Sequence, residues 1–127
     1  MKLAYVIPYV DDVALTLDFY ERAFGVTRRF LHESGTYGEV ETGATTLSFT
    51  ARSLMRELGK ALGQADPHAP VFEIAFATDD VPAAYSRAVA AGAVPMQDPA
   101  QMPWGQTVAY VSDPNGILVE LCTPVGP

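Results

Sequence analysis

Two glutamates are the side chains best placed to do chemistry, because each is an acid inside an otherwise apolar segment. Glu73 lies in the segment FEI and Glu120 in the segment VEL. If the two approach each other, like-charge repulsion and loss of solvation would raise the apparent pKa of the pair. Such a pair can accept hydrogen bonds in a structural network, contact a cationic ligand or act as a general base.

The two histidines and the single cysteine add little. His32 stands beside Glu33 at the end of a predicted strand and His68 lies in a proline-rich stretch, so we interpret both as surface residues. Cys122 is the only cysteine, which excludes an intramolecular disulfide and a thiolate metal cluster. Its apolar surroundings favour a core position.

A Pro-Trp-Gly sequence at Trp104 predicts an aromatic side chain that projects over the open face of a sheet. There it could stack on a planar ligand. Alternatively, Trp104 covers a sheet edge or contacts a second subunit. Phe30, Tyr37 and Tyr110 are the candidate neighbours of this ligand site.

Composition excludes several classes of function. The chain has 15 acidic and 8 scattered basic residues and a net charge of -7, which disfavours binding to a phosphate backbone. No apolar run approaches the roughly 20 residues that span a bilayer. The N-terminus lacks the apolar core and cleavage site of a signal peptide, so we expect a cytoplasmic protein without nucleic-acid or membrane partners.

The elements that must position these side chains recur twice. The motif VDDV at 10–13 precedes a helical pattern that ends at Gly25, and TDDV at 78–81 precedes one that ends at Gly92. Asp12 is the predicted cap of the first helix, and Asp79 or Asp80 of the second. Strand-like runs surround the helices at 3–10, 27–33, 38–42 and 45–50, and again at 71–78, 94–96, 106–112 and 117–123. The sequence therefore predicts an α+β fold of two βαβββ repeats, about 1–51 and 71–125, joined by a linker with a short helix at about 52–70.

Alternation along the strands assigns the side chains to two faces of each sheet. The apolar face, expected to pack under the helices, comprises Leu47, Phe49, Phe72, Ile74, Phe76, Val119 and Leu121. The opposite face comprises Tyr5, Ile7, Tyr9, Thr46, Ser48, Thr50, Glu73, Ala75, Ala77, Leu118, Glu120 and Cys122. Its mixture of small, polar and acidic residues suits a ligand cavity better than a dry core.

These motifs, with Phe19-Tyr20 in the first helix and DPNG at 113–116 leading into LVEL, resemble the vicinal-oxygen-chelate superfamily of glyoxalases, bleomycin-resistance proteins and extradiol dioxygenases. The resemblance covers nearly the whole chain. It implies one domain, residues 1–127, whose repeats form a cupped half-barrel sheet that is completed in a symmetric homodimer. The chain looks most similar to the metal-free antibiotic-binding members, in which a similar Pro-Trp-Gly stretch stacks on a planar ligand.

The resemblance also implies four metal positions, which match Tyr5, Ser48, Glu73 and Glu120 in this sequence. The repeat supports the match, since Tyr5 and Glu73 each lie seven residues before an aspartate of the repeated motif. A phenol and a primary hydroxyl are poor ligands for zinc, nickel or iron. We therefore expect no catalytic metal and no other cofactor.

Our leading hypothesis is a metal-free protein that sequesters a hydrophobic or planar compound, such as an antibiotic. A compound that also carries a positive charge would suit the two acids. Its candidate ligand contacts are Tyr5, Phe30, Tyr37, Ser48, Glu73, Trp104, Tyr110 and Glu120. The alternative is an enzyme: a metal-dependent lyase, isomerase or dioxygenase, or an acid–base catalyst that uses Glu73 and Glu120. A third interpretation is a structural or regulatory domain with a vestigial pocket.

Overall fold

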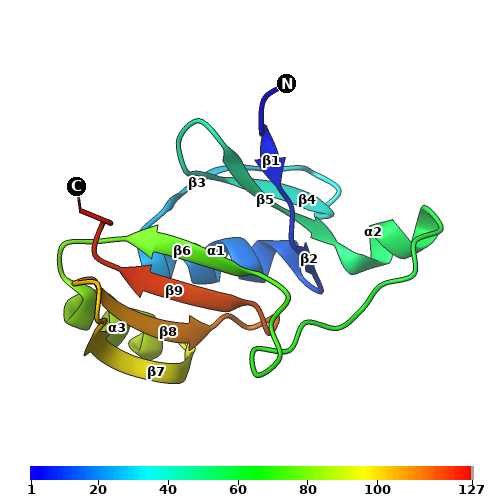
Figure 1. Ribbon diagram of the computed structural model, residues 1–127. Coiled ribbons are helices and arrows are strands. Elements are labelled where there is room, and N and C mark those ends of the chain that lie inside the picture. The colour runs from blue at the N-terminus through cyan, green and yellow to red at the C-terminus, as the bar shows by residue number, and fades with distance from the viewer. Residues whose placement is uncertain (127) are drawn as a thin grey trace. The chain divides into compact units, whose positions relative to one another are not determined.

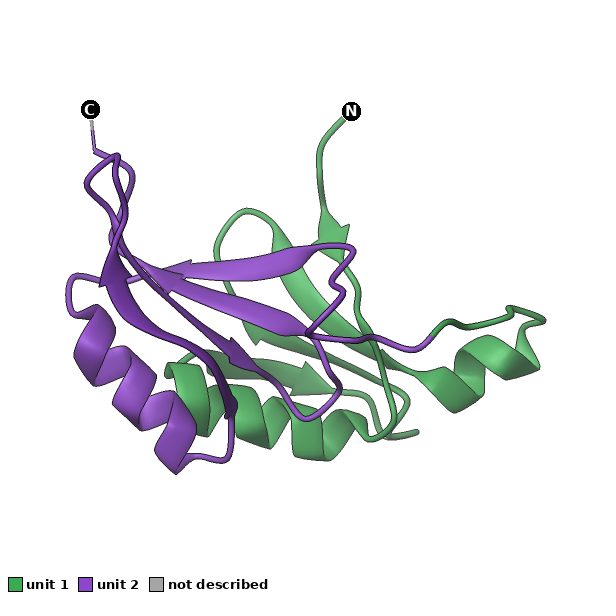
Figure 2. Ribbon diagram, turned by 60° about the horizontal axis from the view of Figure 1, so that its bottom comes forward, with its two compact units in different colours: residues 1–63 green, residues 64–127 purple. Residues whose placement is uncertain are grey.

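The computed structural model describes residues 1–126, and the chain divides into two compact units, residues 1–63 and 64–127 (Figures 1 and 2). The first unit contains β1 (Tyr5–Val6), β2 (Tyr9–Val10), α1 (Val13–Phe24), β3 (Thr27–Leu31), β4 (Tyr37–Glu41), β5 (Thr46–Ala51) and α2 (Arg52–Glu57). The second contains β6 (Glu73–Ala77), α3 (Val81–Ala90), β7 (Val94–Gln101), β8 (Thr107–Ser112) and β9 (Leu118–Cys122). The predicted α+β fold of two βαβββ repeats is confirmed.

Both units have the same sheet topology. The first sheet has the order β1-β5-β4-β3 with β2 also paired to β5, and the second has the order β6-β9-β8-β7. In each sheet the first strand is parallel to the last strand of its unit, and β2 is also parallel to β5. The remaining pairs are antiparallel. Neither sheet closes on itself. One face of each sheet packs against the long helix of its unit, and we call the other face the open face.

The repeated aspartates cap the two helices as their positions predict. Asp12 accepts a hydrogen bond from the Leu15 amide at 3.0 Å, and Asp80 accepts one from the Ala83 amide at 3.1 Å. The first helix ends at Gly25 in the left-handed conformation with φ of 70°. Of the two candidate caps in the second repeat, Asp80 is therefore the one used.

Each helix packs on one face of its own sheet. In the first unit the Tyr20 ring lies 4.8 Å from that of Phe49, and both side chains are fully buried. The sheet allows this approach because Gly38 has no side chain: a Cβ there would lie 2.6 Å from Leu17 Cδ1. In the second unit Val119 and Leu121 are buried, as their place on the apolar face predicts.

Three segments differ from the prediction. Pro8 divides the first strand into β1 and β2, because it has no amide hydrogen to donate. The short helix of the linker, predicted within about 52–70, covers only its first residues, Arg52–Glu57. Phe72, expected to pack under a helix, precedes β6 and is 49% exposed. Among residues 1–126, no helix combines the length and apolar character that crossing a membrane requires.

Candidate functional site

The open face of the second sheet brings three of the predicted site residues together. Tyr110 on β8 pairs directly with Glu120 on β9, and Ala75 pairs with Glu120 from the other side. Glu73 lies two residues before Ala75 on the same face of β6. The Tyr110 hydroxyl donates a hydrogen bond to Glu120 Oε1 at 3.3 Å.

The two acids influence each other and their neighbours. Burial raises the pKa of Glu120, and the charge of Glu73 raises it further. Burial, together with the charges of both acids, raises the pKa of Tyr110 to about 12, so this phenol stays protonated and acts as a donor. Cys122 is buried beside them, and burial followed by the charges of Glu120 and Glu73 raises its thiol pKa. Among the described residues of the second unit, 64–126, no basic side chain pairs with Glu73 or Glu120.

Charge is unevenly divided between the two units. Seven of the eight Lys and Arg residues lie in residues 1–63, and Arg87 on α3 is the remaining one. The 15 acids divide almost evenly, with eight in the first unit and seven in the second. The second unit thus has a formal charge of -6 against -1 for the first. Its single cation belongs to the helix, which covers the opposite face of the sheet.

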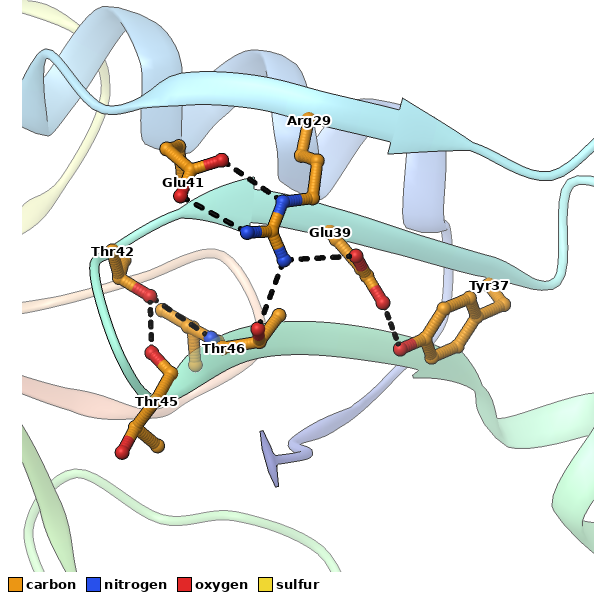
Figure 3. A network of polar contacts seen from close by, with 8 residues as sticks. Arg29, Tyr37, Glu39, Glu41, Thr42, Thr45 and Thr46 are labelled. Atoms are coloured by element: carbon orange, nitrogen blue, oxygen red, sulfur yellow. Dashed lines mark hydrogen bonds and ion pairs between the residues drawn. The ribbon is translucent and has the colours of Figure 1, made fainter. Parts of the chain in front are cut away.

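The open face of the first sheet carries a paired polar network instead (Figure 3). Arg29 donates two hydrogen bonds to Glu41, at 2.9 and 3.0 Å, one to Thr46 at 3.0 Å and one to Glu39 at 3.4 Å. Glu39 also accepts a hydrogen bond of 2.6 Å from the Tyr37 hydroxyl. Because Arg29 bridges both acids, the charges on this face are largely compensated.

A β-bulge directs Arg29 onto this face. The pairing of β3 with β4 shifts register between Arg28, opposite Val40, and Phe30, opposite Glu39. Arg29 is the extra residue, and such a bulge places its side chain on the same face as the next one. Arg28, one residue earlier, turns to the helix side and pairs with Glu21 at 3.3 Å.

The four positions that the family metal would use fall at equivalent places in the two sheets. Tyr5 pairs with Thr46, two residues before Ser48, just as Glu73 pairs with Leu118, two residues before Glu120. Ser48 is fully buried, and its hydroxyl has no hydrogen-bond partner among the described residues. Tyr5 is 51% exposed. The repeat register thus places Ser48, and neither of its apolar neighbours, on the open face.

These side chains do not fit a catalytic divalent metal. At these four positions the first unit offers the hydroxyls of Tyr5 and Ser48, and the second offers the carboxylates of Glu73 and Glu120 beside the protonated phenol of Tyr110. Within residues 1–126, no three His, Cys, Asp or Glu side chains gather closely enough to hold a metal ion. Both histidines are exposed, and His32 Nδ1 lies 2.7 Å from Ser34 Oγ.

The predicted aromatic residues fall in different places. Phe30 and Tyr37 are neighbours in the first sheet, with ring centroids 6.0 Å apart. Trp104 lies in the turn between β7 and β8 and is 68% exposed. Its indole N–H donates to Gln106 Oε1 at 2.7 Å, so its polar atom is satisfied while its ring stays exposed.

Sequence reasoning missed Arg29, because nothing in the alternation of residues reveals a bulge. It also missed Glu39, although regular alternation places this residue on the same face as Tyr37. A signal was present in the segment TRRF, where two arginines precede an aromatic residue in a predicted strand. A strict alternation would have placed Arg29 and Phe30 on opposite faces.

Comparisons with known proteins agree with this architecture. Residues 2–121 match the model of the Glyoxalase/Bleomycin resistance protein/Dioxygenase superfamily, and the chain belongs to that superfamily. A comparison with curated proteins gave no significant sequence match.

Solved structures show the same fold. A glyoxalase-related enzyme from Fulvimarina pelagi is 20% identical, with a TM-score of 0.84 over 98% of this chain and 88% of that one. TioX from Micromonospora sp. ML1 is 21% identical, with a TM-score of 0.73 over 97% and 98%. A protein of unknown function from Agrobacterium tumefaciens is 25% identical, with a TM-score of 0.77 over 98% and 94%.

Proposed function

We propose that this protein binds and sequesters a small molecule without a metal, and that the molecule is hydrophobic or planar and carries a positive charge. The observation that carries the proposal is the acid group of Glu73 and Glu120, with Tyr110, on an open sheet face. A cation placed there would supply the partner that these acids lack. It would also favour the ionised form of Glu120.

The charge distribution supports a cationic ligand over an anionic one. The second unit has a formal charge of -6, and its only basic residue lies on the helix side of the sheet. A negative field on this face would concentrate cations and repel anions. On this face, the described residues of β6 and β9 supply two carboxylates, those of Glu73 and Glu120, a donor set better suited to an organic cation than to a catalytic divalent metal.

Trp104 is a candidate contact for a planar ligand. Its ring is largely exposed, and its N–H is already bonded to Gln106, so binding would not require breaking that bond. Stacking of aromatic rings contributes about 0.5–1.5 kcal/mol beyond area burial. Antibiotic resistance by sequestration is one role consistent with membership of a superfamily whose description includes bleomycin-resistance proteins.

A ligand panel tests this proposal. Aromatic cations, with benzylammonium as the simplest, would be compared with benzyl alcohol and benzoate by thermal shift and Trp104 fluorescence. We expect the cations alone to raise the melting temperature, because a ligand that binds only the folded state stabilises it. Glu120→Gln should weaken cation binding about tenfold or more, as loss of a charged hydrogen-bond partner implies.

The matched control is Glu57→Gln, which neutralises an exposed acid on α2 and should leave cation binding unchanged. A panel that neither stabilises the protein nor changes its fluorescence would contradict the proposal. Equal weakening by Glu120→Gln and Glu57→Gln would instead show a general charge effect with no site at Glu120.

The raised pKa of Glu120 beside a phenol also favours a second candidate, an acid–base enzyme of the same superfamily. For such an enzyme, Glu120→Gln would abolish turnover and leave ligand affinity largely intact. Elemental analysis of the purified protein would test the metalloenzyme alternative, since a lyase, isomerase or dioxygenase of that kind retains about one ion per subunit.

We also propose a symmetric homodimer. Within the described residues, the outer strands of both sheets have one unpaired edge. Exposed apolar side chains lie on or beside two of these outer strands, β1 and β6. They are Leu3, Tyr5 and Ile7 near β1, and Val71 and Phe72 near β6. Exposed edges of this kind favour association. Sedimentation equilibrium would give the mass of two chains, and a monomer at every concentration would contradict the dimer.

A further inference from the structure

The polar network of the first sheet leaves two oxygen atoms with unused hydrogen-bonding capacity. Tyr37 gives its single O–H to Glu39 at 2.6 Å, so its oxygen can only accept further hydrogen bonds. Burial, and then the hydrogen bond to Glu39, raises the pKa of Tyr37, so the phenol stays neutral. Glu39 is in turn held by Arg29, which therefore positions the Tyr37 hydroxyl through it.

The hydroxyl oxygen of Ser48 is the second of these atoms. Its side chain is fully buried, and its hydroxyl has no partner of acceptable geometry within residues 1–126. The Ser48 hydroxyl lies close enough to the Tyr37 oxygen to lower the pKa of that phenol, although the geometry between the two is not that of a hydrogen bond. A buried hydroxyl without a partner is costly, so a group that bonds to it gains free energy that an exposed hydroxyl would not give.

The register places the two oxygens next to each other on the open face. Tyr37 pairs with Thr50 and Glu39 with Ser48, so Tyr37 is the diagonal neighbour of Ser48 across β4 and β5. On the other side of β5, Tyr5 pairs with Thr46 and is the second diagonal neighbour. Tyr5 is half exposed and Tyr37 part-exposed. Because Ser48 is fully buried, a ligand reaches its hydroxyl only after neighbouring side chains change rotamer.

The local charges select against ions at this position. Glu39 and Glu41 carry two negative charges against the one positive charge of Arg29, and the excess disfavours an anion. Both carboxylates already accept hydrogen bonds, from Arg29 and in the case of Glu39 also from Tyr37, which leaves them less capacity to hold a cation. An uncharged group meets neither obstacle. An acceptor on Tyr37 beside a hydroxyl on Ser48 matches a group that carries both an N–H or O–H donor and an acceptor.

We propose that Tyr37 and Ser48 form a subsite for an uncharged donor–acceptor group, a carboxamide above all, with Arg29 and Glu39 as positioning residues. The proposal rests on the proposed small-molecule binding and adds the chemistry of one part of the ligand. The subsite lies wholly within the first unit. It is therefore testable separately from the acids of the second.

The test is a set of titrations of ¹⁵N-labelled full-length protein with benzamide, acetanilide, benzoate and benzylammonium. Both amides should give saturable shifts at the backbone amides of Ser48 and Tyr37, and benzoate none there. Ser48→Ala and Tyr37→Phe should each weaken amide binding about fivefold, the loss of one hydrogen bond. Ser53→Ala, on the exposed face of α2, is the matched control and should change nothing.

Folding is controlled within the same series. Ser48→Ala removes a hydroxyl without a partner, so its melting temperature should equal or exceed that of the unmodified protein. The subsite is overturned if neither amide shifts Ser48 or Tyr37, or if Ser48→Ala and Tyr37→Phe bind both amides unchanged. Failure of benzylammonium to bind, with the amides bound, would contradict the cation site alone.

Discussion

The two open faces use the same scaffold positions for opposite electrostatics. Glu39 on β4 of the first sheet is equivalent to Tyr110 on β8 of the second. Ser48 on β5 is equivalent to Glu120 on β9. Each sheet therefore pairs an acid with a hydroxyl. The acid lies on the last strand in the second sheet, but on the strand before it in the first. The arrangement of the backbone does not decide which residue is the acid.

The bulge residue makes the larger difference. The pairing of β7 with β8 has the same bulge as the pairing of β3 with β4. The register shifts between Pro95 and Gln97 in the second sheet, as it does between Arg28 and Phe30 in the first. Met96 therefore occupies the position in the second unit that Arg29 occupies in the first. Arg29 neutralises Glu39 and Glu41, whereas a thioether cannot neutralise Glu73 or Glu120. The first sheet thus pairs its acids with a cation of its own, the guanidinium of Arg29. This difference supports a ligand as the source of the cation in the second sheet.

The largest expected effect concerns packing below these faces. Gly38 and Ala109 occupy equivalent positions under the helices, but a Cβ at Gly38 would lie 2.6 Å from Leu17 Cδ1 and 3.1 Å from Val13 Cγ1. Gly38→Ala should destabilise the protein by roughly 1–3 kcal/mol through overpacking. Urea denaturation measures this. An unchanged unfolding free energy would show that α1 moves away freely.

Met96→Arg should give the second face a cation at the position that Arg29 occupies in the first. The new guanidinium would compete with a cationic ligand for Glu73 and Glu120, and we expect benzylammonium affinity to fall about tenfold, the effect of roughly 1.4 kcal/mol. Calorimetric titration measures the affinity. Met96→Gln controls for the change of shape, and equal losses in both variants would contradict the electrostatic explanation.

The two phenols allow a finer comparison. Tyr37 donates to Glu39 at 2.6 Å, but Tyr110 donates to Glu120 at 3.3 Å. Because the shorter bond to an acid is the stronger, Tyr37→Phe should destabilise the protein by about 1 kcal/mol and Tyr110→Phe by less. Thermal denaturation of both variants checks the order. The reverse order would show that Glu120 depends on its phenol more than Glu39 does.

Particular residues show how far the sequence predicts this structure. The repeated aspartates and Gly25 determine the helix ends through local chemistry, so both helices were predictable. β7 was predicted to end at Met96, yet it continues to Gln101 through Pro99, because an edge strand tolerates a residue that cannot donate. The Glu73, Glu120 and Tyr110 group follows from alternation and pairing. Arg29 and Met96 could not be assigned to a face, because their bulges interrupt the alternation.

The smallest expected effect is a dependence of stability on pH that comes from Glu120. Its pKa in the folded protein is raised above the ordinary value of 4.5, so the folded state binds a proton more tightly than the unfolded state. This contribution is complete below pH 4.5 and is lost as the pH rises through the raised value. Glu120→Gln should remove that loss, so the variant should gain stability relative to the unmodified protein between pH 4.5 and 7, by about 1 kcal/mol or less. Denaturation across this range, with Glu57→Gln as the control, measures the gain. A constant difference at every pH would show that the pKa of Glu120 is not raised in the folded protein.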